Sequence, residues 1–426
     1  MIDFAMSNCA WANADFVDIL VQYEPASLEK HLRAGTPWGY DERNLAIYGV
    51  MQRRGGDFMT YEGTAAAVRA NMRRIKGKDP EAVLILSGDH VYSENYMPAV
   101  EEHLKRKADL TVYTTPMPLA EASSFGVMKV GTGLRHGTHE KGNIIDFAEK
   151  PDAAKAAKFK LDDATKALIG STKKGDVLAS MGVYIFSPHA LYEELERGGA
   201  DFGRNIIPRM VSEGKRRVFA HVFNSYWEDV GRLENLIQAN FYAIKHGGEI
   251  FTEHLKTNIR NLPPAVVEGY CESSIVSPGC HIGKGAVVRN SVLGPQTLVE
   301  REWANPENPS EMLPGAQVIN SILHGGDRHV TNKQGDIIKP HYSIVRSGAV
   351  LENILGDRNL FFDRGVYLNF RESPEKIKEA IQALGLEENN EEHPRGIYNI
   401  TRNGFLVLGK PEYGQEKIFP ECFLRQ

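Results

Sequence analysis

Asp89 stands at the end of a short apolar run and is the first candidate for chemistry. The run is Val83–Leu86, and Ser87 and Gly88 separate it from Asp89. Four consecutive apolar residues that end in a turn are typical of a buried parallel strand. In an open α/β sheet, ligands bind at the carboxyl ends of such strands, and a carboxylate next to a glycine suits a magnesium ligand. Many strands end in Gly-Asp turns without a ligand, so the pattern alone makes Asp89 a candidate only.

Two further charged residues lie in comparable positions. Asp229 follows an aromatic pair and precedes a helix that we expect to begin near Arg232. It is a second candidate carboxylate for a metal ion, and it can equally be the N-cap of that helix, since the two roles are compatible. Lys150 ends an amphipathic strand, and the following Pro151 disfavours helical conformation at Lys150. A lysine so placed can bind a phosphate as a point charge, although most lysines are simply solvated.

The elements that must position these residues follow from the pattern up to about residue 245. Short apolar runs alternate there with amphipathic stretches. Helical spacing extends over Tyr96–Lys107, and strand character returns at Leu110–Thr115 and Met181–Phe186. A Ser-Pro pair at 187–188 signals the start of a helix that reaches Arg197. Alternating strands and helices predict an α/β domain with a mostly parallel, doubly wound sheet.

The pattern changes from Pro263 onward. An apolar residue recurs at every sixth position with Gly, Ser, Asn and Pro between, and three longer segments also resemble one another. The hexad positions are Tyr270, Val276, Ile282 and Val288, and the longer repeats are Gly285–Gly294, Gly315–Gly326 and Gly348–Asp357. This spacing suits a triangular β-solenoid whose coils bury a column of aliphatic side chains. The alternative is an ordinary β-rich domain with accidental spacing, and we favour the solenoid because both repeats occur together.

The two patterns divide the chain into two domains and a linker. We place the catalytic domain at residues 1–245, the linker at 246–262, and the solenoid with its C-terminal closure at 263–426. We expect Trp303–Pro314 and His324–Lys339 to form loops between coils, and Ser373–Gln382 to form a short helix.

The composition is that of a globular protein. The chain has 426 residues, of which 42% are hydrophobic and 25% charged, and its net charge of -5 gives no sign of a nucleic-acid partner. The four cysteines include no Cys-x-x-Cys pair, which favours free thiols in a reducing compartment. No apolar run reaches the length of a membrane span, and no basic leader precedes one. We therefore expect a cytoplasmic protein without membrane contact.

Eight motifs follow one another along the chain. They are IDFAMSNC at 2–9, Gln52 with YEGTAAAV at 61–68, LSGDHVY at 86–92, SFGVM at 124–128, EKP at 149–151, LASMGVYIF at 178–186, DFGRNIIP at 201–208 and YWEDVG at 226–231. In this order they closely resemble the glucose-1-phosphate adenylyltransferase family, the ADP-glucose pyrophosphorylases, and the match continues to the C-terminus. The resemblance implies a Rossmann-like nucleotidyltransferase domain followed by a left-handed parallel β-helix. Members of the family commonly assemble as homotetramers.

The resemblance also implies a reaction and a set of site residues. ATP and glucose 1-phosphate would give ADP-glucose and pyrophosphate, for glycogen or a similar glucan. This in-line displacement needs positioning and charge neutralisation more than a protein nucleophile. The implied catalytic residues are Asp89, Lys150 and Asp229, with Asp89 and Asp229 as ligands of Mg²⁺. Glucose 1-phosphate would contact Tyr61, Gly126, Glu149, Lys150 and Ser180, and the nucleotide would lie near Gly63, Thr64, Gly88 and Asp89.

The sequence departs from the family pattern at its beginning. Members have a first strand and a glycine-rich loop upstream of the IDF motif, which starts here at residue 2. That loop supplies the backbone amides that bind the triphosphate. We expect the native protein to begin further upstream, because the remaining site motifs are nearly intact. Reading the coding DNA upstream of Met1 would test this expectation against its alternative, a degenerate paralogue.

Two other functions remain open. Sister nucleotidyltransferases have the same fold and use UTP, dTTP or GTP. The residues of the motifs SMG at 180–182 and YWEDVG at 226–231 favour the ADP-glucose branch. A non-catalytic regulatory subunit of a tetramer is the second alternative. The absent loop favours it, as does Ala66, which stands at an aspartate position of the family. The intact Asp89, Lys150 and Asp229 oppose it.

Overall fold

The chain forms two compact units, and each is described by itself. The computed structural model describes residues 1–22, 25–49, 61–131, 134–135, 138–139, 142–169, 175–257, 263–306, 308, 310–324, 330–331, 337–339, 343–356, 360–362, 364, 366–369, 398–400, 405–408 and 418–419. Gln52 and the helix predicted at Ser373–Gln382 lie outside them. Within the described part, none of the helices combines the length and apolar character that a membrane crossing requires.

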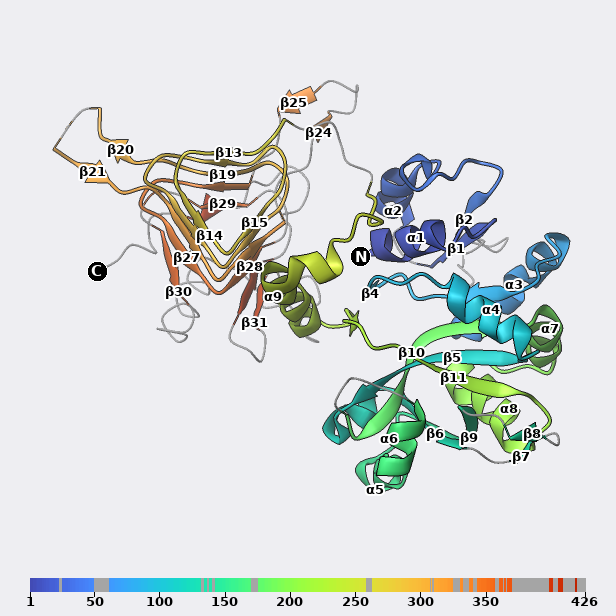
Figure 1. Cartoon of the computed structure of the whole chain (residues 1–426). Helices are drawn as coiled ribbons and strands as arrows, with labels where there is room; N and C mark the ends of the chain where they lie inside the picture. Colours follow the sequence, from blue (N-terminus) through green and yellow to red (C-terminus); the bar gives the residue numbers. More distant parts are fainter. Residues whose placement is uncertain are drawn as a thin grey trace. The chain divides into compact units, whose positions relative to one another are not determined.

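The first unit comprises Met1–Asp229 and Phe251–Asn258. Its α-helices are α1 (Ile2–Trp11), α2 (Pro25–Leu32), α3 (Thr64–Gly77), α4 (Met97–Lys105), α5 (Ala153–Ala156), α6 (Asp163–Ile169), α7 (Pro188–Glu196) and α8 (Ile207–Glu213) (Figure 1). Shorter helical turns are η1 (Thr36–Trp38), η2 (Leu119–Ser124), η3 (Ala157–Phe159) and the π-helical η4 (Phe202–Ile206). Its strands are β1 (Val17–Val21), β2 (Leu45–Gly49), β3 (Val83–Ile85), β4 (His90–Val91), β5 (Leu110–Met117), β6 (Gly126–Gly131), β7 (Leu134–Arg135), β8 (Thr138–His139), β9 (Asn143–Glu149), β10 (Val177–Phe186), β11 (Val218–Val222) and β12 (Glu228–Asp229).

A six-stranded sheet in the order β3-β10-β5-β11-β9-β6 forms the centre of this unit. Of its neighbouring pairs, β5 and β11 are parallel, and the others are antiparallel. The sheet is therefore mixed, and the prediction of a mostly parallel sheet is wrong for the described residues. The reason is that β10 runs against both of its neighbours and that β6 and β9 pair directly as antiparallel strands.

The individual elements agree with the sequence pattern more closely than the topology does. Helix α4 lies inside the predicted 96–107 helix, β5 begins at the predicted Leu110, and α7 begins at the predicted Pro188. Strand β10 ends at the predicted Phe186 but begins four residues earlier, at Val177, than the expected Met181. The run at 83–86 was expected to be a buried parallel strand, and this is wrong. Strand β3 is half-buried because it lies at the edge of the sheet, and it pairs with β10 in the antiparallel direction.

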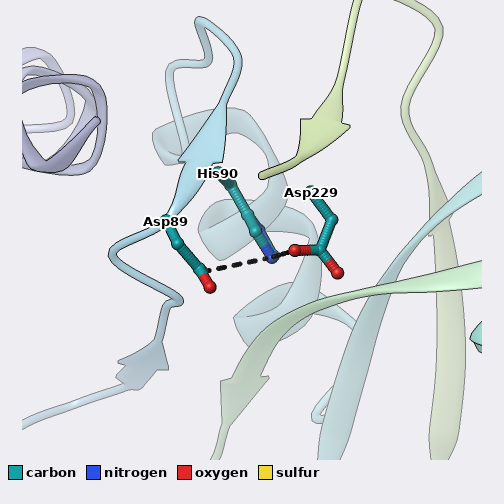
Figure 2. A group of neighbouring side chains, drawn as sticks. All are labelled: Asp89, His90 and Asp229. Carbon is teal, nitrogen blue, oxygen red and sulfur yellow. Dashed lines mark ion pairs between the residues drawn. The ribbon is translucent and has the colours of Figure 1, made fainter. Parts of the chain in front are cut away.

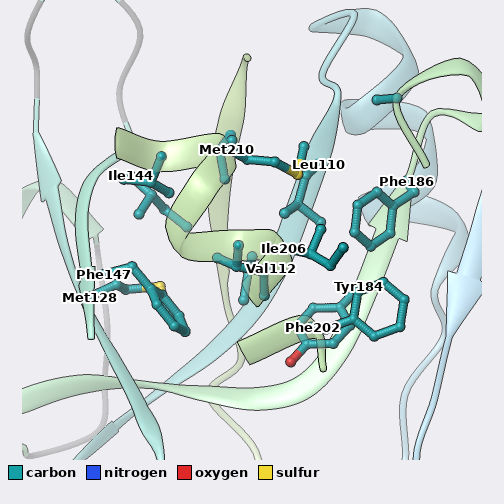
Figure 3. Close-up of a cluster of buried hydrophobic side chains, with 14 of the residues drawn as sticks. Leu110, Val112, Met128, Ile144, Phe147, Tyr184, Phe186, Phe202, Ile206 and Met210 are labelled. Atoms are coloured by element: carbon teal, nitrogen blue, oxygen red, sulfur yellow. The ribbon is translucent and has the colours of Figure 1, made fainter. Parts of the chain in front are cut away.

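Helices cover both faces of the sheet, as the alternation of side chains along β10 shows. Tyr184 and Phe186 contribute to one core cluster, and Val183 and Ile185 contribute to another on the opposite face. Side chains of α3, α7, η4 and α8 complete the first cluster, and Figure 3 shows residues of η4 and α8 against the strands. Side chains of α1 and α4 complete the second. The unit is thus a three-layer α/β fold, which agrees with the predicted class.

The second unit comprises Val230–Ile250 and Ile259–Gln426. One sheet contains β13 (Val266–Val267), β16 (His281–Ile282), β19 (Thr297–Val299), β26 (Ser343–Val345), β29 (Phe361–Phe362) and β33 (Ile418–Phe419). A second contains β14 (Tyr270–Glu272), β17 (Val287–Arg289), β22 (Gln317–Ile319), β27 (Val350–Glu352) and β30 (Tyr367–Asn369). A third contains β15 (Ile275–Val276), β18 (Val292–Leu293), β23 (Ile322–Leu323), β28 (Ile354–Gly356), β32 (Leu406–Leu408) and β31 (Tyr398–Ile400).

Successive strands of this unit visit the three sheets in turn, as in a triangular solenoid (Figure 1). Neighbouring coils pair in parallel, apart from the antiparallel β31 and β32. Of the hexad positions, Ile282 and Val288 are fully buried in the common core. Tyr270 is exposed, because it pairs with the outward-facing Val287, whereas its neighbour Cys271 pairs with the buried Val288 and packs against the core. The left-handed winding stays a prediction.

The two expected loops contain short hairpins. Strands β20 (Trp303–Ala304) and β21 (Met312–Leu313) pair within the first, and β24 (Val330–Thr331) and β25 (Ile337–Lys339) pair within the second. Helix α9 (Leu233–Ile250) also belongs to the second unit, where Ile237 packs against Ile322, Leu355 and Phe405. The helix is interrupted at His246, whose backbone is not helical. The domain limits at residues 245 and 263 stay a prediction.

Candidate active site

The antiparallel pair of β4 and β12 brings Asp89 and Asp229 together (Figure 2). Asp229 lies opposite His90 in the pairing, and Asp89 directly precedes β4. One oxygen of each carboxylate and one ring nitrogen of His90 lie within 4.8 Å of one another, close enough for a shared metal ion. Two candidates that the sequence predicted separately are therefore neighbours in space.

The two carboxylates differ from His90 in their exposure to solvent. The side chains of Asp89 and Asp229 are 49% and 38% exposed, whereas that of His90 is 6% exposed. Ser87 Oγ donates a hydrogen bond of 2.7 Å to Asp89 Oδ1. Carboxylate oxygens that a metal ion can reach from solvent suit a hard divalent cation such as Mg²⁺. The residues present thus fit a divalent metal ion.

His90 is a member of this cluster that the sequence analysis left without a role. Its Nε2 lies 3.8 Å from Asp89 Oδ1 and 4.0 Å from Asp229 Oδ1. Its Nδ1 accepts a hydrogen bond of 3.3 Å from Trp227 Nε1. Burial lowers the pKa of His90, and the two carboxylates act in the opposite direction. The signal available in the sequence was a histidine next to the candidate aspartate at the end of a strand.

Glu149 and Gly126 form part of a second cluster. They face each other in the register of β9 and β6. A Cβ atom added at Gly126 or at Gly203 would lie 2.7 or 2.5 Å from Glu149 Oε2, so a side chain at either position would force this carboxylate to move. The pKa of Glu149 is raised, first by burial and then by the nearby Asp201, while Lys150 and Arg204 act in the opposite direction. The two cations make this cluster suitable for a phosphorylated ligand.

Lys150 follows β9 directly, as predicted, and has an unusual backbone. Its φ of 43° lies in the left-handed region, which costs a residue with a Cβ roughly 1–2 kcal/mol. Its N–H donates a hydrogen bond of 3.0 Å to the carbonyl oxygen of Phe125, and its side chain is exposed. The turn therefore presents the ammonium group to solvent beside Glu149.

Strand β10 borders both clusters through a bulge that contains Gly182. Pairing with β5 is interrupted between Ser180 and Tyr184. Within the bulge, the N–H of Gly182 donates to Ser180 Oγ at 3.2 Å, and the φ of Gly182 is 70°. A Cβ atom at Gly182 would lie 3.5 Å from His90 Cε1, so this glycine sits next to the ring of His90. The side chain of Ser180 in turn forms a hydrogen bond with the hydroxyl of Tyr184. Burial is the main cause that raises the pKa of Tyr184, and the nearby Glu149 raises it further.

Two of the four residues predicted near the nucleotide, Gly63 and Thr64, lie at the N-terminus of α3. Gly63 is the N-cap, and a Cβ atom there would lie 2.5 Å from the carbonyl oxygen of Ala200. Thr64 Oγ1 donates to Asp201 Oδ2 at 3.4 Å, and the hydroxyl of Tyr61 accepts a hydrogen bond of 3.3 Å from Asn71 on the same helix. The other two predicted residues, Gly88 and Asp89, lie side by side before β4, and Gly88 is exposed. The start of α3 therefore meets Asp201, which also acts on Glu149.

Residues 1–245, which contain the mixed sheet and the paired carboxylates, match the family model described as nucleotidyl transferase, so this part of the chain is a nucleotidyl transferase domain. A glucose-1-phosphate adenylyltransferase of Clostridium perfringens strain SM101 is 34% identical over 330 residues, covering 70% of this chain and 77% of the relative. The enzyme of the same name from Clostridium acetobutylicum is 36% identical over 71% of this chain and 75% of its own length. That from Desulforamulus reducens is 30% identical over 82% and 89%. The chain belongs to the glucose-1-phosphate adenylyltransferase family of nucleotidyl transferases.

Proposed function

We propose that this protein transfers the adenylyl group of ATP to glucose 1-phosphate, giving ADP-glucose and pyrophosphate for the synthesis of glycogen or a similar glucan. The observation that carries the proposal is the convergence of Asp89 and Asp229 on one exposed cluster in a chain of this family. Membership of the glucose-1-phosphate adenylyltransferases supports the choice of substrates.

The reaction forms one bond and breaks one. A phosphate oxygen of glucose 1-phosphate attacks the α-phosphorus of ATP, and the bond from that phosphorus to the oxygen bridging to the β-phosphorus breaks as pyrophosphate leaves. The attacking group is already an anion, so no side chain has to remove a proton from it. The protein has to position two polyanions and neutralise their charge.

The clusters described above supply groups for both tasks. In this proposal Lys150 binds the phosphate of glucose 1-phosphate, while Glu149 accepts hydrogen bonds from sugar hydroxyls. Tyr61, Gly126 and Ser180 border the same substrate, and Gly63, Thr64 and Gly88 lie near the nucleotide. Asp89 and Asp229 hold the divalent ion, which we take to be Mg²⁺. When bound, Mg²⁺ offsets the negative charge of the phosphates.

Substitution of the paired carboxylates tests the proposal. On the natural full-length chain, with ATP, glucose 1-phosphate and Mg²⁺, Asp89→Asn and Asp229→Asn should each lower the rate of ADP-glucose formation at least about 100-fold. Their melting temperatures should stay close to that of the natural chain, because both side chains are partly exposed. Asp41→Asn is the matched control, since the Asp41 carboxylate lies at the surface, where it forms an ion pair with the Arg43 side chain and accepts the backbone N–H of Arg43. Near-normal ADP-glucose formation by Asp89→Ala would refute the assignment.

The same assay with UTP, dTTP and GTP decides between this proposal and its sister activities. Preference for ATP supports the proposal, whereas a higher kcat/KM for another nucleotide overturns the choice of substrate. Binding of glucose 1-phosphate without turnover of any nucleotide would identify a regulatory subunit instead. We also infer a homotetramer and a left-handed solenoid. Light scattering of the purified protein measures the first, and an experimental structure the second.

A further inference from the structure

His90 occupies a fixed position between an indole and two carboxylates. Its ring is nearly perpendicular to that of Trp227, at 87° with 5.4 Å between ring centroids. Trp227 contacts Nδ1, the two aspartates face Nε2, and Gly182 adjoins Cε1. Figure 2 shows the ring lying between the side chains of Asp89 and Asp229. A buried ring held on three sides has its two nitrogens in distinct environments.

The contact with Trp227 determines which ring nitrogen carries the proton. The indole Nε1–H can only donate a hydrogen bond, so Nδ1 of His90 must present its lone pair to it. A neutral imidazole with an acceptor at Nδ1 carries its hydrogen on Nε2, and an imidazolium could not accept at all. Turning the ring over would place a carbon atom against the buried indole N–H and leave that donor without a partner.

The environment of Nε2 leads to the same tautomer. An N–H directed at two carboxylate oxygens is attracted to them, whereas a lone pair would be repelled. The distances of 3.8 and 4.0 Å are longer than a direct hydrogen bond, so the contact is electrostatic or bridged by one water molecule. Nε2 lies almost equally far from the two oxygens, and its hydrogen can serve both aspartates.

We infer that His90 is a positioning residue that directs its Nε2–H at Asp89 and Asp229, and that it is not a third metal ligand. The inference rests on the proposed function, in which the two aspartates hold a divalent ion. A metal bond to Nε2 would require a lone pair there, and the hydrogen would then move to Nδ1, against the indole N–H of Trp227. Two donors would face each other in a buried site. His90 therefore orients the carboxylates and leaves the ion with oxygen ligands.

The tautomer can be measured on the metal-free protein. In nitrogen-15 NMR of the chain labelled at histidine, the signals that disappear in His90→Gln belong to His90. Their chemical shifts should show a protonated Nε2 and an unprotonated Nδ1. Addition of saturating Mg²⁺ should leave the protonation state of each nitrogen unchanged. A hydrogen on Nδ1, or a change at Nε2 typical of metal ligation, would overturn the inference. Trp227→Phe removes the donor and should allow both tautomers.

Metal affinity separates positioning from a merely structural role. His90→Gln keeps an N–H near Nε2, and His90→Leu removes it. Mn²⁺ titrations followed by electron paramagnetic resonance should give dissociation constants within about 3-fold of the natural chain for Gln and raised at least about 10-fold for Leu. Equal Mn²⁺ affinities for the Leu variant and the natural chain, or equal losses in both variants, would contradict the inference.

The outcomes also distinguish this inference from the proposed function. If ADP-glucose is formed and His90→Leu binds Mn²⁺ normally, the inference fails while the function stands. If no sugar nucleotide is formed but the tautomer and the order of Mn²⁺ affinities are as expected, the function fails while the role of His90 stands. Loss of Mn²⁺ binding in Asp89→Asn shows that the titration reports this site.

Discussion

The backbone N–H of Lys150 is bonded to the carbonyl oxygen of Phe125, at 3.0 Å, and the ring of Phe125 packs against Trp227 with 5.5 Å between centroids. Phe125 therefore connects the turn that carries the candidate phosphate-binding lysine to the indole that orients His90. The cluster around Glu149 and the cluster around Asp89 share this residue. The position of the Lys150 backbone therefore depends in part on how Phe125 packs against Trp227.

The side chain of Lys150 should favour binding of glucose 1-phosphate, while its left-handed backbone should lower the stability of the fold. Lys150→Ala and Lys150→Gly both remove the ammonium group, so each should raise the KM for glucose 1-phosphate roughly 10- to 100-fold, the worth of a hydrogen bond to a charged group. Glycine also relieves the left-handed backbone, so Lys150→Gly should be more stable than Lys150→Ala by about 1 kcal/mol. Steady-state kinetics and urea unfolding measure the two effects. Equal stabilities of the variants would contradict the argument.

Gly203 should control the position of the Glu149 carboxylate. A methyl group in Gly203→Ala would meet Glu149 Oε2 at 2.5 Å and force the carboxylate to move, so the KM for glucose 1-phosphate should rise about 10-fold. Stability should change little, because the displaced group is the end of a flexible side chain. In the background of Glu149→Ala the same substitution should have no further effect on KM. Gly77→Ala, where no atom lies within 4 Å of the added methyl group, is the control.

Glu94 should make the stability of the first unit depend on pH. Burial raises the pKa of this carboxyl to about 7 from 4.5, although the Tyr113 hydroxyl, which donates to it at 3.4 Å, opposes the change. A folded-state pKa above the unfolded value means that stability is present below pH 4.5 and is lost as the pH rises towards 7. Glu94→Gln should therefore gain stability relative to the natural chain between these values, by roughly 2–3 kcal/mol once the carboxyl is ionised.

Urea unfolding at pH 5, 6, 7 and 8 follows this gain. The difference between Glu94→Gln and the natural chain should grow with pH and level off above about 7. The same difference at pH 5 and pH 8 would show that the carboxyl does not titrate in this range. Tyr113→Phe removes the donor that favours the charged form and should move the pH dependence upward.

A ladder of asparagines should stabilise one corner of the solenoid. Asn290, Asn320 and Asn353 all have left-handed backbones, with φ of 46°, 48° and 59°. The amide of Asn290 donates to Asn320 Oδ1 at 2.8 Å, and that of Asn320 donates to Asn353 Oδ1. Asn320→Gly keeps the backbone but loses both bonds, which should cost about 1–2 kcal/mol, and Asn320→Ala should cost about 1 kcal/mol more. Calorimetry of the three proteins should give this order, and a more stable alanine variant would contradict it.

The candidate site was predictable where it depends on local rules. The turn after an apolar run pointed to Asp89, although that run is not the buried parallel strand that was expected, and the proline after Lys150 placed that lysine outside a helix. The role of His90 was not predictable in this way, because its tautomer depends on Trp227, which lies 137 residues away in the sequence. Asp201 was missed for a similar reason, since only the folded chain brings it to Thr64 and Glu149.

The fold shows the same division. Hydrophobic spacing located β5, β10 and the buried Ile282 and Val288 of the solenoid. Buried positions recur at regular intervals along a strand or coil, so apolar residues repeat with the same spacing in the sequence. Strand direction leaves no such period. The run that ends at Phe186 is equally apolar whether its neighbours are parallel or antiparallel, so the mixed sheet could not be read from it. Hydrophobic spacing also does not reveal the bulge after Ser180. The only local signal for it is Gly182, a glycine inside a mostly apolar strand.

Strand β10 is paired on both sides of that bulge, and this limits how the enzyme can move. In the proposed function, the sugar-phosphate cluster and the metal cluster both adjoin this strand, the first near Ser180 and Tyr184 and the second near Gly182, so we expect their separation to change little when substrates bind. We expect rearrangement on substrate binding to occur in elements outside the central sheet, such as the first turn of α3, where the N–H of Ala66 bonds the carbonyl oxygen of Ala200. Engineering a wider acceptor specificity would accordingly start at that turn rather than along the strand.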